Sequence, residues 1–210
     1  MILSIDTTSE FGSIALTERE RTIEEVALHS PDGFGHVLFQ QIEVLLAQYG
    51  VKVRDLDCLA AASGPGSFTG VRVGLSAAKG LAEAAGKRVV AVSNLRALAS
   101  FGSAPLRSPV IDARRGEVYA ALYDSRLELV IPEAVLKFED WLKRLPGEGF
   151  ELVSAIPMDT QLPVVITPRE LAAAIGRIAW MEFSAGRAAD PAAIDANYVR
   201  RSDAEIFWKE

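Results

Sequence analysis

The stretch Ser63–Gly74, SGPGSFTGVRVG, joins an apolar run over residues 56–62 to a segment with helical periodicity that reaches Ala85. It places four glycines and three hydroxyl residues between a predicted buried strand and a predicted helix. Such a turn either holds a phosphate on its backbone amides or lets another part of the molecule come very close to the chain. The rest of the sequence has to decide between these two uses.

Neither standard phosphate fingerprint fits this loop. A Walker A loop places a lysine and then a serine or threonine directly after its last glycine, but Val71 and Arg72 follow Gly70. A dinucleotide loop needs G-x-G-x-x-G, and Gly64, Gly66 and Gly70 are spaced one residue too widely. Two interpretations remain: amides at a capped helix N-terminus that face a ligand, or a tight turn from strand to helix.

The helix predicted after the loop is apolar or small over about twice the ~100° that an ordinary surface helix buries. One stripe consists of Val71, Leu75, Ala78, Ala82 and Ala85, and a second of Val73, Ala77, Gly80 and Ala84. One stripe must cover the chain's own sheet, while the second permits close approach of another helix. Burial within the monomer and contact with another chain are both open.

The first residues predict a hairpin, and a similar pattern occurs half a chain later. An apolar run ends at Asp6, and a second run follows a turn. Residues 5–16 align with residues 111–122, with Ile-Asp opening and Ala-Leu closing both segments. This offset predicts two lobes with related folds, residues 1–102 and 103–210. Further elements are expected as helices over residues 35–49 and around 168–184, and as a strand over 88–92.

Composition and charge narrow the functional classes. Half of the 210 residues are hydrophobic and 24% are charged, which is typical of a well-cored globular chain. The formal net charge of −6 argues against this chain alone gripping a nucleic-acid backbone. Cys58 is the only cysteine, so no intrachain disulfide can form, and a cytoplasmic protein is expected. No signal peptide and no membrane-spanning run is predicted.

The sequence predicts no catalytic constellation and no metal site. His29 and His36 are the only histidines, and they lie seven residues apart without an H-E-x-x-H motif. The residues around Ser67 do not form the G-x-S-x-G elbow of a serine hydrolase.

These elements together resemble the TsaB (YeaZ-like) family. The match is strong over residues 1–123 and weak from 126 to 190, and the proline that usually follows the His36 region is absent. The matching residues are Ile5–Thr8, His36, Gly64–Gly74 with Ala78–Ala82, Asp112–Arg114 with Glu117–Tyr119, and the tail Tyr198–Arg200.

The resemblance implies a two-lobed actin-like ATPase (ASKHA) fold in a shortened, degenerate form, with mixed sheets flanked by helices. It implies a non-catalytic subunit that pairs with a catalytic paralogue, TsaD, and an ATPase, TsaE. That complex installs threonylcarbamoyl on N6 of the adenosine next to the tRNA anticodon, and this chain would meet tRNA only through the complex. First-lobe helices would contact TsaD, or a second copy in its absence. The expected interface residues are His36, Phe39, Gly70, Val73, Gly74, Ala77, Gly80 and Ala84.

A remnant nucleotide cleft is expected at Asp6, Thr7, Thr8 and Asp112. No cofactor is required for the implied role, but the resemblance leaves room for ATP or ADP at this cleft or at a subunit junction. The second hairpin has one glycine and two arginines, so efficient phosphoryl transfer is not expected. The alternative functions are a metal-dependent glycoprotease-like hydrolase and a small actin-fold kinase.

Overall fold

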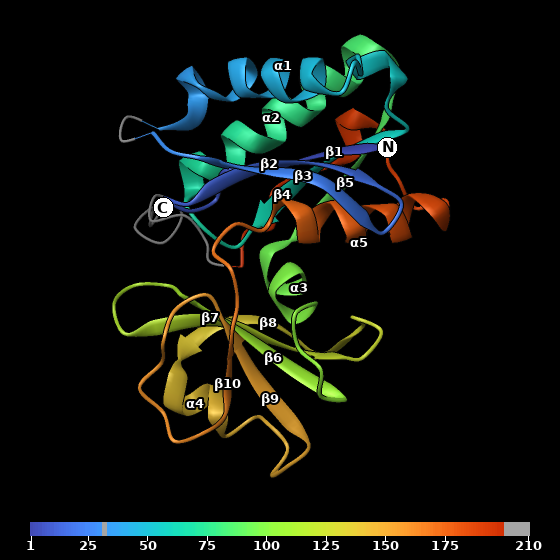
Figure 1. The fold of residues 1–210 in the computed structure, drawn as a ribbon. Helices are drawn as coiled ribbons and strands as arrows, with labels where there is room; N and C mark the ends of the chain where they lie inside the picture. The colour runs from blue at the N-terminus through green and yellow to red at the C-terminus, as the bar shows by residue number, and fades with distance from the viewer. Residues whose placement is uncertain (31–32, 200–210) are drawn as a thin grey trace, which may run out of the picture.

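The computed structural model describes residues 1–30 and 33–199 and contains two five-stranded sheets, each flanked by helices (Figure 1). The first sheet has the order β3-β2-β1-β4-β5 and the second the order β10-β9-β6-β7-β8. The mixed α/β architecture with two sheets is therefore as predicted.

The first sheet combines a hairpin with parallel strands. Its strands are β1 (Ile2–Asp6), β2 (Gly12–Glu18), β3 (Arg21–Leu28), β4 (Cys58–Gly64) and β5 (Arg88–Ser93). Strands β1, β2 and β3 pair antiparallel, whereas β1, β4 and β5 pair parallel. All five residues of β1 are buried. Because side chains alternate between the two faces of a strand, both faces of the sheet are covered at β1. Leu3 and Ile5 join one core cluster and Ile2 joins another.

Helices cover both faces of this sheet. In Figure 1, α1 (Leu38–Gln48) and α2 (Phe68–Ala85) lie above it, and α5 (Ala172–Ser184) lies below it. The predicted stop of α2 is confirmed, because Gly86 adopts the left-handed conformation with a φ of 63°. The first helix is shorter than predicted. A separate 3₁₀ turn, η1 (Phe34–His36), precedes α1, and a second, η2 (Val53–Asp55), precedes β4.

The second sheet repeats the topology of the first. Its strands are β6 (Leu106–Asp112), β7 (Glu117–Asp124), β8 (Leu129–Lys137), β9 (Phe150–Ser154) and β10 (Val164–Ile166). Read from β8 to β10, their order and senses match those from β3 to β5, and β6 takes the place of β1. The repeat predicted from residues 5–16 and 111–122 is thus present in the topology. Helix α4 (Phe138–Leu142) packs on this sheet through the fully buried Trp141.

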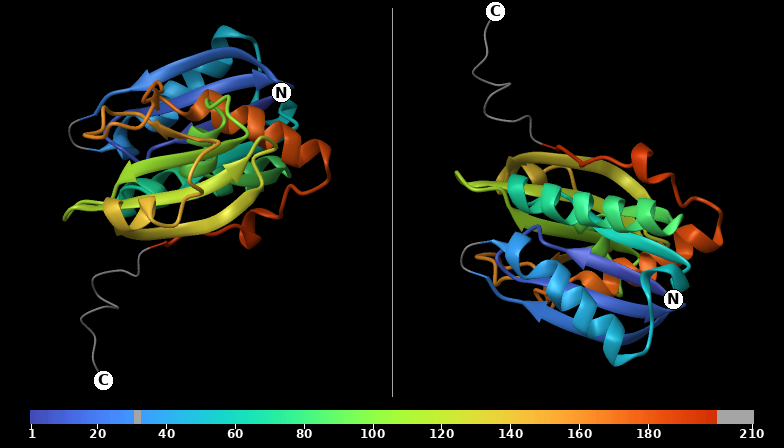
Figure 2. Two further views of the ribbon diagram at one scale, coloured as in Figure 1. Left: turned by 90° about the horizontal axis from the view of Figure 1, so that it is seen from below. Right: turned by 90° about the horizontal axis from the view of Figure 1, so that it is seen from above.

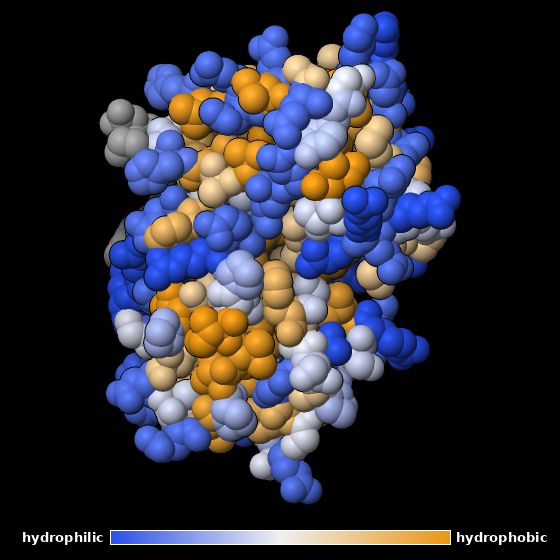
Figure 3. Space-filling model, viewed as in Figure 1, coloured by the Kyte–Doolittle hydropathy of each residue, from blue (hydrophilic) through white to orange (hydrophobic). Residues whose placement is uncertain are grey.

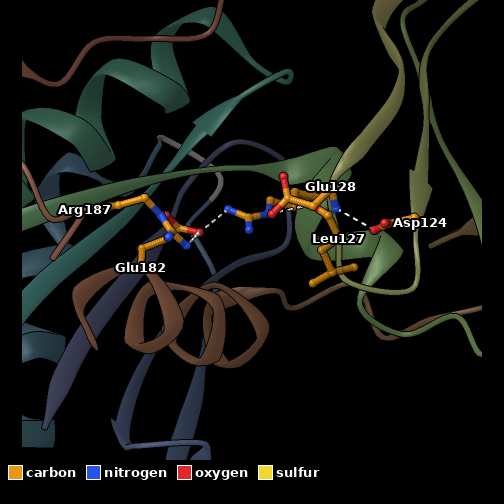
Figure 4. A network of polar contacts seen from close by, with 6 residues as sticks. Asp124, Leu127, Glu128, Glu182 and Arg187 are labelled. Carbon is orange, nitrogen blue, oxygen red and sulfur yellow. Dashed lines mark hydrogen bonds and ion pairs between the residues drawn. The ribbon is translucent and has the colours of Figure 1, made fainter. Parts of the chain in front are cut away.

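Helix α3 (Asn94–Ala99) joins the two sheets, and an ion-pair network lies beside it (Figure 4). Arg96 donates from Nε to the Leu127 carbonyl at 3.2 Å and from Nη1 to Glu182 at 2.8 Å. Arg187 donates to the same Glu182 carboxylate at 2.5 Å. The predicted boundary between residues 102 and 103 falls between α3 and β6, while α5, from the second half, packs against the first sheet.

Within residues 1–30 and 33–199, no helix combines the length and apolar character that crossing a membrane requires.

Candidate functional site

The glycine-rich turn packs against the turn that follows β1. A Cβ atom at Gly66 would lie 2.5 Å from the Thr8 carbonyl oxygen, and one at Gly70 would overlap the Thr7 carbonyl oxygen. The Ser67 amide donates to the Thr8 carbonyl at 2.6 Å, and its hydroxyl caps α2 by accepting from the Gly70 amide at 3.3 Å. The glycines therefore admit the chain's own first turn, which favours the tight-turn interpretation.

The polar groups of that first turn are engaged inside the chain. Asp6 is 1% exposed, and its Oδ1 accepts from the Thr8 amide at 2.9 Å and the Thr8 hydroxyl at 2.6 Å. Burial raises the pKa of Asp6 above its ordinary value, although the hydrogen bonds from Thr8 oppose the shift. The Thr7 hydroxyl donates to the Gly70 carbonyl at 2.7 Å. All three predicted cleft residues of the first lobe are buried.

Asn94 ties this turn to the glycine loop. Its Nδ2 donates to the Thr8 hydroxyl at 2.7 Å and to Asp6 at 3.5 Å, and its Oδ1 accepts from the Gly64 amide at 3.0 Å. Asn94 is the first residue of α3 and does not cap it; the cap is Ser93, whose hydroxyl accepts from two α3 amides. The sequence signal that could have predicted the contacts of Asn94 is its position directly after β5. The carboxyl ends of neighbouring parallel strands lie at the same edge of a sheet, which brings Asn94 close to the ends of β1 and β4.

Asp112 has a different environment from Asp6, although the two occupy equivalent places in the repeat. Asp112 is exposed, and its Oδ1 accepts from the Arg114 amide at 2.8 Å. Arg114 and Arg115 adopt positive φ angles of 64° and 57°, which places a strained turn beside it. The nucleotide cleft between the two aspartates stays a prediction.

Three of the predicted interface residues lie inside the chain. Gly70, Gly74 and Ala77 are buried, and a Cβ atom at Gly74 would approach the Thr7 hydroxyl to 2.7 Å. These three therefore provide internal contacts of α2 and do not present surface to a partner in this arrangement. The others are accessible: His36, Phe39, Gly80 and Ala84 are exposed and Val73 is half-buried.

An apolar groove of about 420 Å³ lies along α1, between that helix, the segment of residues 50–53 that follows it and Leu81 of α2. Its apolar wall includes Phe39, Ile42, Leu46, Ala47, Val53 and Leu81, and Glu43 and Lys52 add charge. The Phe39 side chain is 55% exposed. Figure 3 shows apolar side chains interspersed along this helical layer, and a further apolar patch on the second lobe near α4 and β10.

The remaining reactive groups form no evident centre. Burial raises the pKa of the Cys58 thiol to about 12, so this cysteine is a poor nucleophile. In the described part of the chain, no three His, Cys, Asp or Glu side chains gather as metal ligands. Tyr198 and Val199 of the predicted tail motif are described, whereas Arg200 lies outside the described residues.

Known proteins match this chain in sequence. The model of the family described as TsaD, tRNA N6-adenosine threonylcarbamoyltransferase, matches residues 34–176. The tRNA threonylcarbamoyladenosine biosynthesis protein TsaB of Bacillus subtilis (strain 168) is 37% identical over 149 residues, covering 69% of this chain and 65% of that protein. Its namesake in Escherichia coli (strain K12) is 36% identical over 159 residues, covering 70% and 68%. The chain thus spans about two thirds of the length of these relatives.

A solved structure matches the whole fold. YeaZ from Pseudomonas aeruginosa superposes with a TM-score of 0.79 at 25% identity, covering 94% of this chain and 98% of that one. Together with the family model, this similarity confirms the two-lobed actin-like fold. The chain belongs to the family that the TsaD model describes and, within it, to the TsaB, YeaZ-like proteins.

Proposed function

We propose that this chain is a non-catalytic accessory subunit of tRNA threonylcarbamoyladenosine biosynthesis. It pairs with a TsaD-type catalytic subunit and works with a TsaE-type ATPase. The relatives from Bacillus subtilis and Escherichia coli, which carry the name of this biosynthesis, support the role. In this proposal tRNA binds only to the assembled complex, since the chain's formal net charge of −6 disfavours contact with RNA phosphates.

The observation that carries the pairing is the groove between α1 and α2. Its walls are mostly apolar, and Phe39 projects at 55% exposure beside it. Exposed aromatic side chains beside a concave apolar surface are typical anchors of protein interfaces. We propose that a helix of the TsaD-type subunit fills this groove, and that a second copy of the chain fills it when that subunit is absent.

The arrangement of the cleft residues supports a role without chemistry. A phosphate site needs amides and hydroxyls that point outward, but the side chains of Asp6, Thr7 and Thr8 bond within the chain. We therefore expect no ATP turnover with candidate sugars and no protease activity with or without a chelator. Turnover that depends on this chain would overturn the non-catalytic assignment and favour the kinase or the hydrolase.

The pairing is tested by light scattering on a sizing column, with the chain alone and mixed with the TsaD-type protein of the same genome. We expect a self-dimer that converts to a one-to-one heterodimer. A chain that stays monomeric and does not bind that protein would overturn the proposed function.

A matched pair of α1 variants tests the surface itself. Phe39 lines the groove and is 55% exposed, whereas Val44 is 54% exposed on the same helix and does not line it. Phe39→Asp should weaken pairing at least tenfold, because it places a charge at the anchor position. Val44→Asp should leave the affinity within about threefold of wild type, which is a change under 1 kcal/mol. Equal effects of the two variants would place the interface elsewhere.

A further inference from the structure

The C-terminal strap, residues 186–199, follows α5 and runs back beside α2 toward the N-terminal end of that helix (Figure 2). Val89 and Ala189 exchange two backbone hydrogen bonds of 2.9 Å, so the strap covers the outer edge of β5. Its 3₁₀ turn η3 (Pro191–Ala193) packs against α2, and Ile194 enters the first core at 7% exposure. The strap is therefore part of the first lobe, although it comes from the end of the chain.

The strap ends on the glycine-rich loop. The Asn197 amide donates to the Ser63 carbonyl at 2.8 Å, and the Asn197 carbonyl lies 3.3 Å from the position of a Cβ at Gly64. In the next residue, the Tyr198 hydroxyl accepts from Arg72 Nε at 3.0 Å. Two consecutive residues thus cross the carboxyl end of β4 and reach the first turns of α2.

One carboxylate joins the strap to both sheets. Glu133, on β8 of the second sheet, accepts from Asn197 Nδ2 at 2.5 Å. Its other oxygen accepts from the Tyr123 hydroxyl at 2.7 Å and from the Ser93 hydroxyl. Ser93 ends β5 of the first sheet, whereas Tyr123 lies on β7 of the second. Breaking the bond between Asn197 and Glu133 would therefore affect the strap and the junction between the lobes together.

The strap closes a particular part of the first sheet. Strands β2 and β3 lie on one side of β1, and β4 and β5 on the other, so the order in which strands join the sheet reverses between the parallel neighbours β1 and β4. Open α/β sheets bind ligands outside the carboxyl ends of the strands at such a switch point. In this chain the switch point is filled by the protein itself. The buried Asn94 side chain hydrogen-bonds to Asp6 and Gly64, and the Asn197 amide of the strap donates to the Ser63 carbonyl.

We propose that the C-terminal strap is a latch whose catch is the pair Asn197–Glu133. With the catch closed, the strap covers the carboxyl end of β4 and the edge of β5, and the two sheets keep one relative arrangement. With the catch broken, the strap leaves β5 and the lobes move with respect to each other. This inference concerns the chain by itself and does not depend on the proposed partners.

A pair of substitutions of nearly equal side-chain size tests the Asn197–Glu133 hydrogen bond: the first breaks it and the second restores it. Asn197→Asp places a second carboxylate against Glu133 and removes a hydrogen bond to a charged group. Hydrogen exchange of the Val89 and Ala189 amides, which bond between strap and sheet, should accelerate about ten- to hundredfold. Adding Glu133→Gln supplies an amide that donates to the new carboxylate, and should return exchange to within about threefold of wild type.

The distance between the lobes provides a second measurement. Spin labels at the exposed positions Glu83, on α2, and Arg144, after α4, report it directly. We expect one narrow distance distribution for wild type and for the double variant, and a broader one for Asn197→Asp. The latch is refuted if Asn197→Asp leaves exchange at Val89 and Ala189 unchanged. It is also refuted if amides of β6 and β9 accelerate equally, because the variant would then only destabilise the whole fold.

Discussion

Replacing Gly70 with alanine should destabilise the chain strongly, although alanine is the better helix former. Gly70 is the third residue of α2, and its Cβ would overlap the Thr7 carbonyl oxygen and lie 3.0 Å from the carbonyl carbon. Thr7 is 1% exposed, so the turn cannot move away without disturbing its surroundings. Relieving the overlap would strain the 2.7 Å bond from the Thr7 hydroxyl to Gly70 and the 2.6 Å bond from Ser67 to Thr8.

The magnitude follows from three contributions. Overpacking in a buried site costs about 1–3 kcal/mol, and each strained hydrogen bond costs about 1 kcal/mol. The higher helix propensity of alanine returns about 1 kcal/mol. Gly70→Ala should therefore lower the free energy of unfolding by about 3 kcal/mol. Gly80→Ala on the same helix is the control, because a Cβ there meets nothing within 4 Å, and it should add up to about 1 kcal/mol.

Urea unfolding followed by tryptophan fluorescence measures both variants. With an m value of about 2 kcal/mol/M, the midpoint of Gly70→Ala should fall by about 1.5 M. The midpoint of Gly80→Ala should rise or stay unchanged. A midpoint for Gly70→Ala within about 0.3 M of wild type would show that the first turn yields easily, and the close-packing account of the glycine loop would then be wrong.

Three further changes have defined outcomes. Burial raises the pKa of Asp6, so the folded protein holds this proton more tightly than the unfolded chain does. The free energy of unfolding of wild type, relative to that of Asp6→Asn, should therefore fall as the pH rises from 3.8 through the raised pKa. A difference that does not depend on pH would contradict this. Hydrogen bonds, the largest contribution coming from Arg187, lower the pKa of Glu182. Glu182→Gln should therefore have a lower free energy of unfolding than wild type above pH 4.5, and the difference should vanish as the pH falls through the lowered pKa. Urea unfolding at each pH measures this difference. Trp141→Phe removes a fully buried indole that donates to Ser108 at 2.8 Å. It should lower the free energy of unfolding in urea by about 2–3 kcal/mol, whereas a decrease of less than about 1 kcal/mol would contradict the packing described.

Local signals predicted the parts of the fold that local contacts determine. The helical periodicity that reaches Ala85 predicted where α2 ends, and Gly86, which stops the helix, acts within one helical turn of its own position. The repeat of Ile-Asp at residues 5–6 and 111–112 predicted two lobes with related folds. In the structure each Ile-Asp pair ends a strand that has one parallel and one antiparallel neighbour.

Elements and contacts that depend on distant partners were not predictable in this way. Strand β3 is an edge strand with charged residues, so it lacks the apolar alternation of a half-buried strand. The sequence predicted two stripes of apolar or small residues on α2, but only the approach of Thr7, more than 60 residues earlier, places Gly70 and Gly74 inside. The contacts of Asn94 and Glu133 likewise join segments far apart in the chain.

The same contacts that weaken a catalytic interpretation favour a rigid subunit. A nucleotide gripped by both hairpins would need Asp6 and Asp112 in similar surroundings, but Asp6 is buried behind three hydrogen bonds and Asp112 is exposed. Freeing the Asp6 carboxylate would break bonds that also hold Asn94 and the glycine loop. The first lobe therefore keeps its strand ends fixed beneath α2. A fixed α2 would favour the proposed docking surface beside α1, because binding would then cost little ordering of the helices.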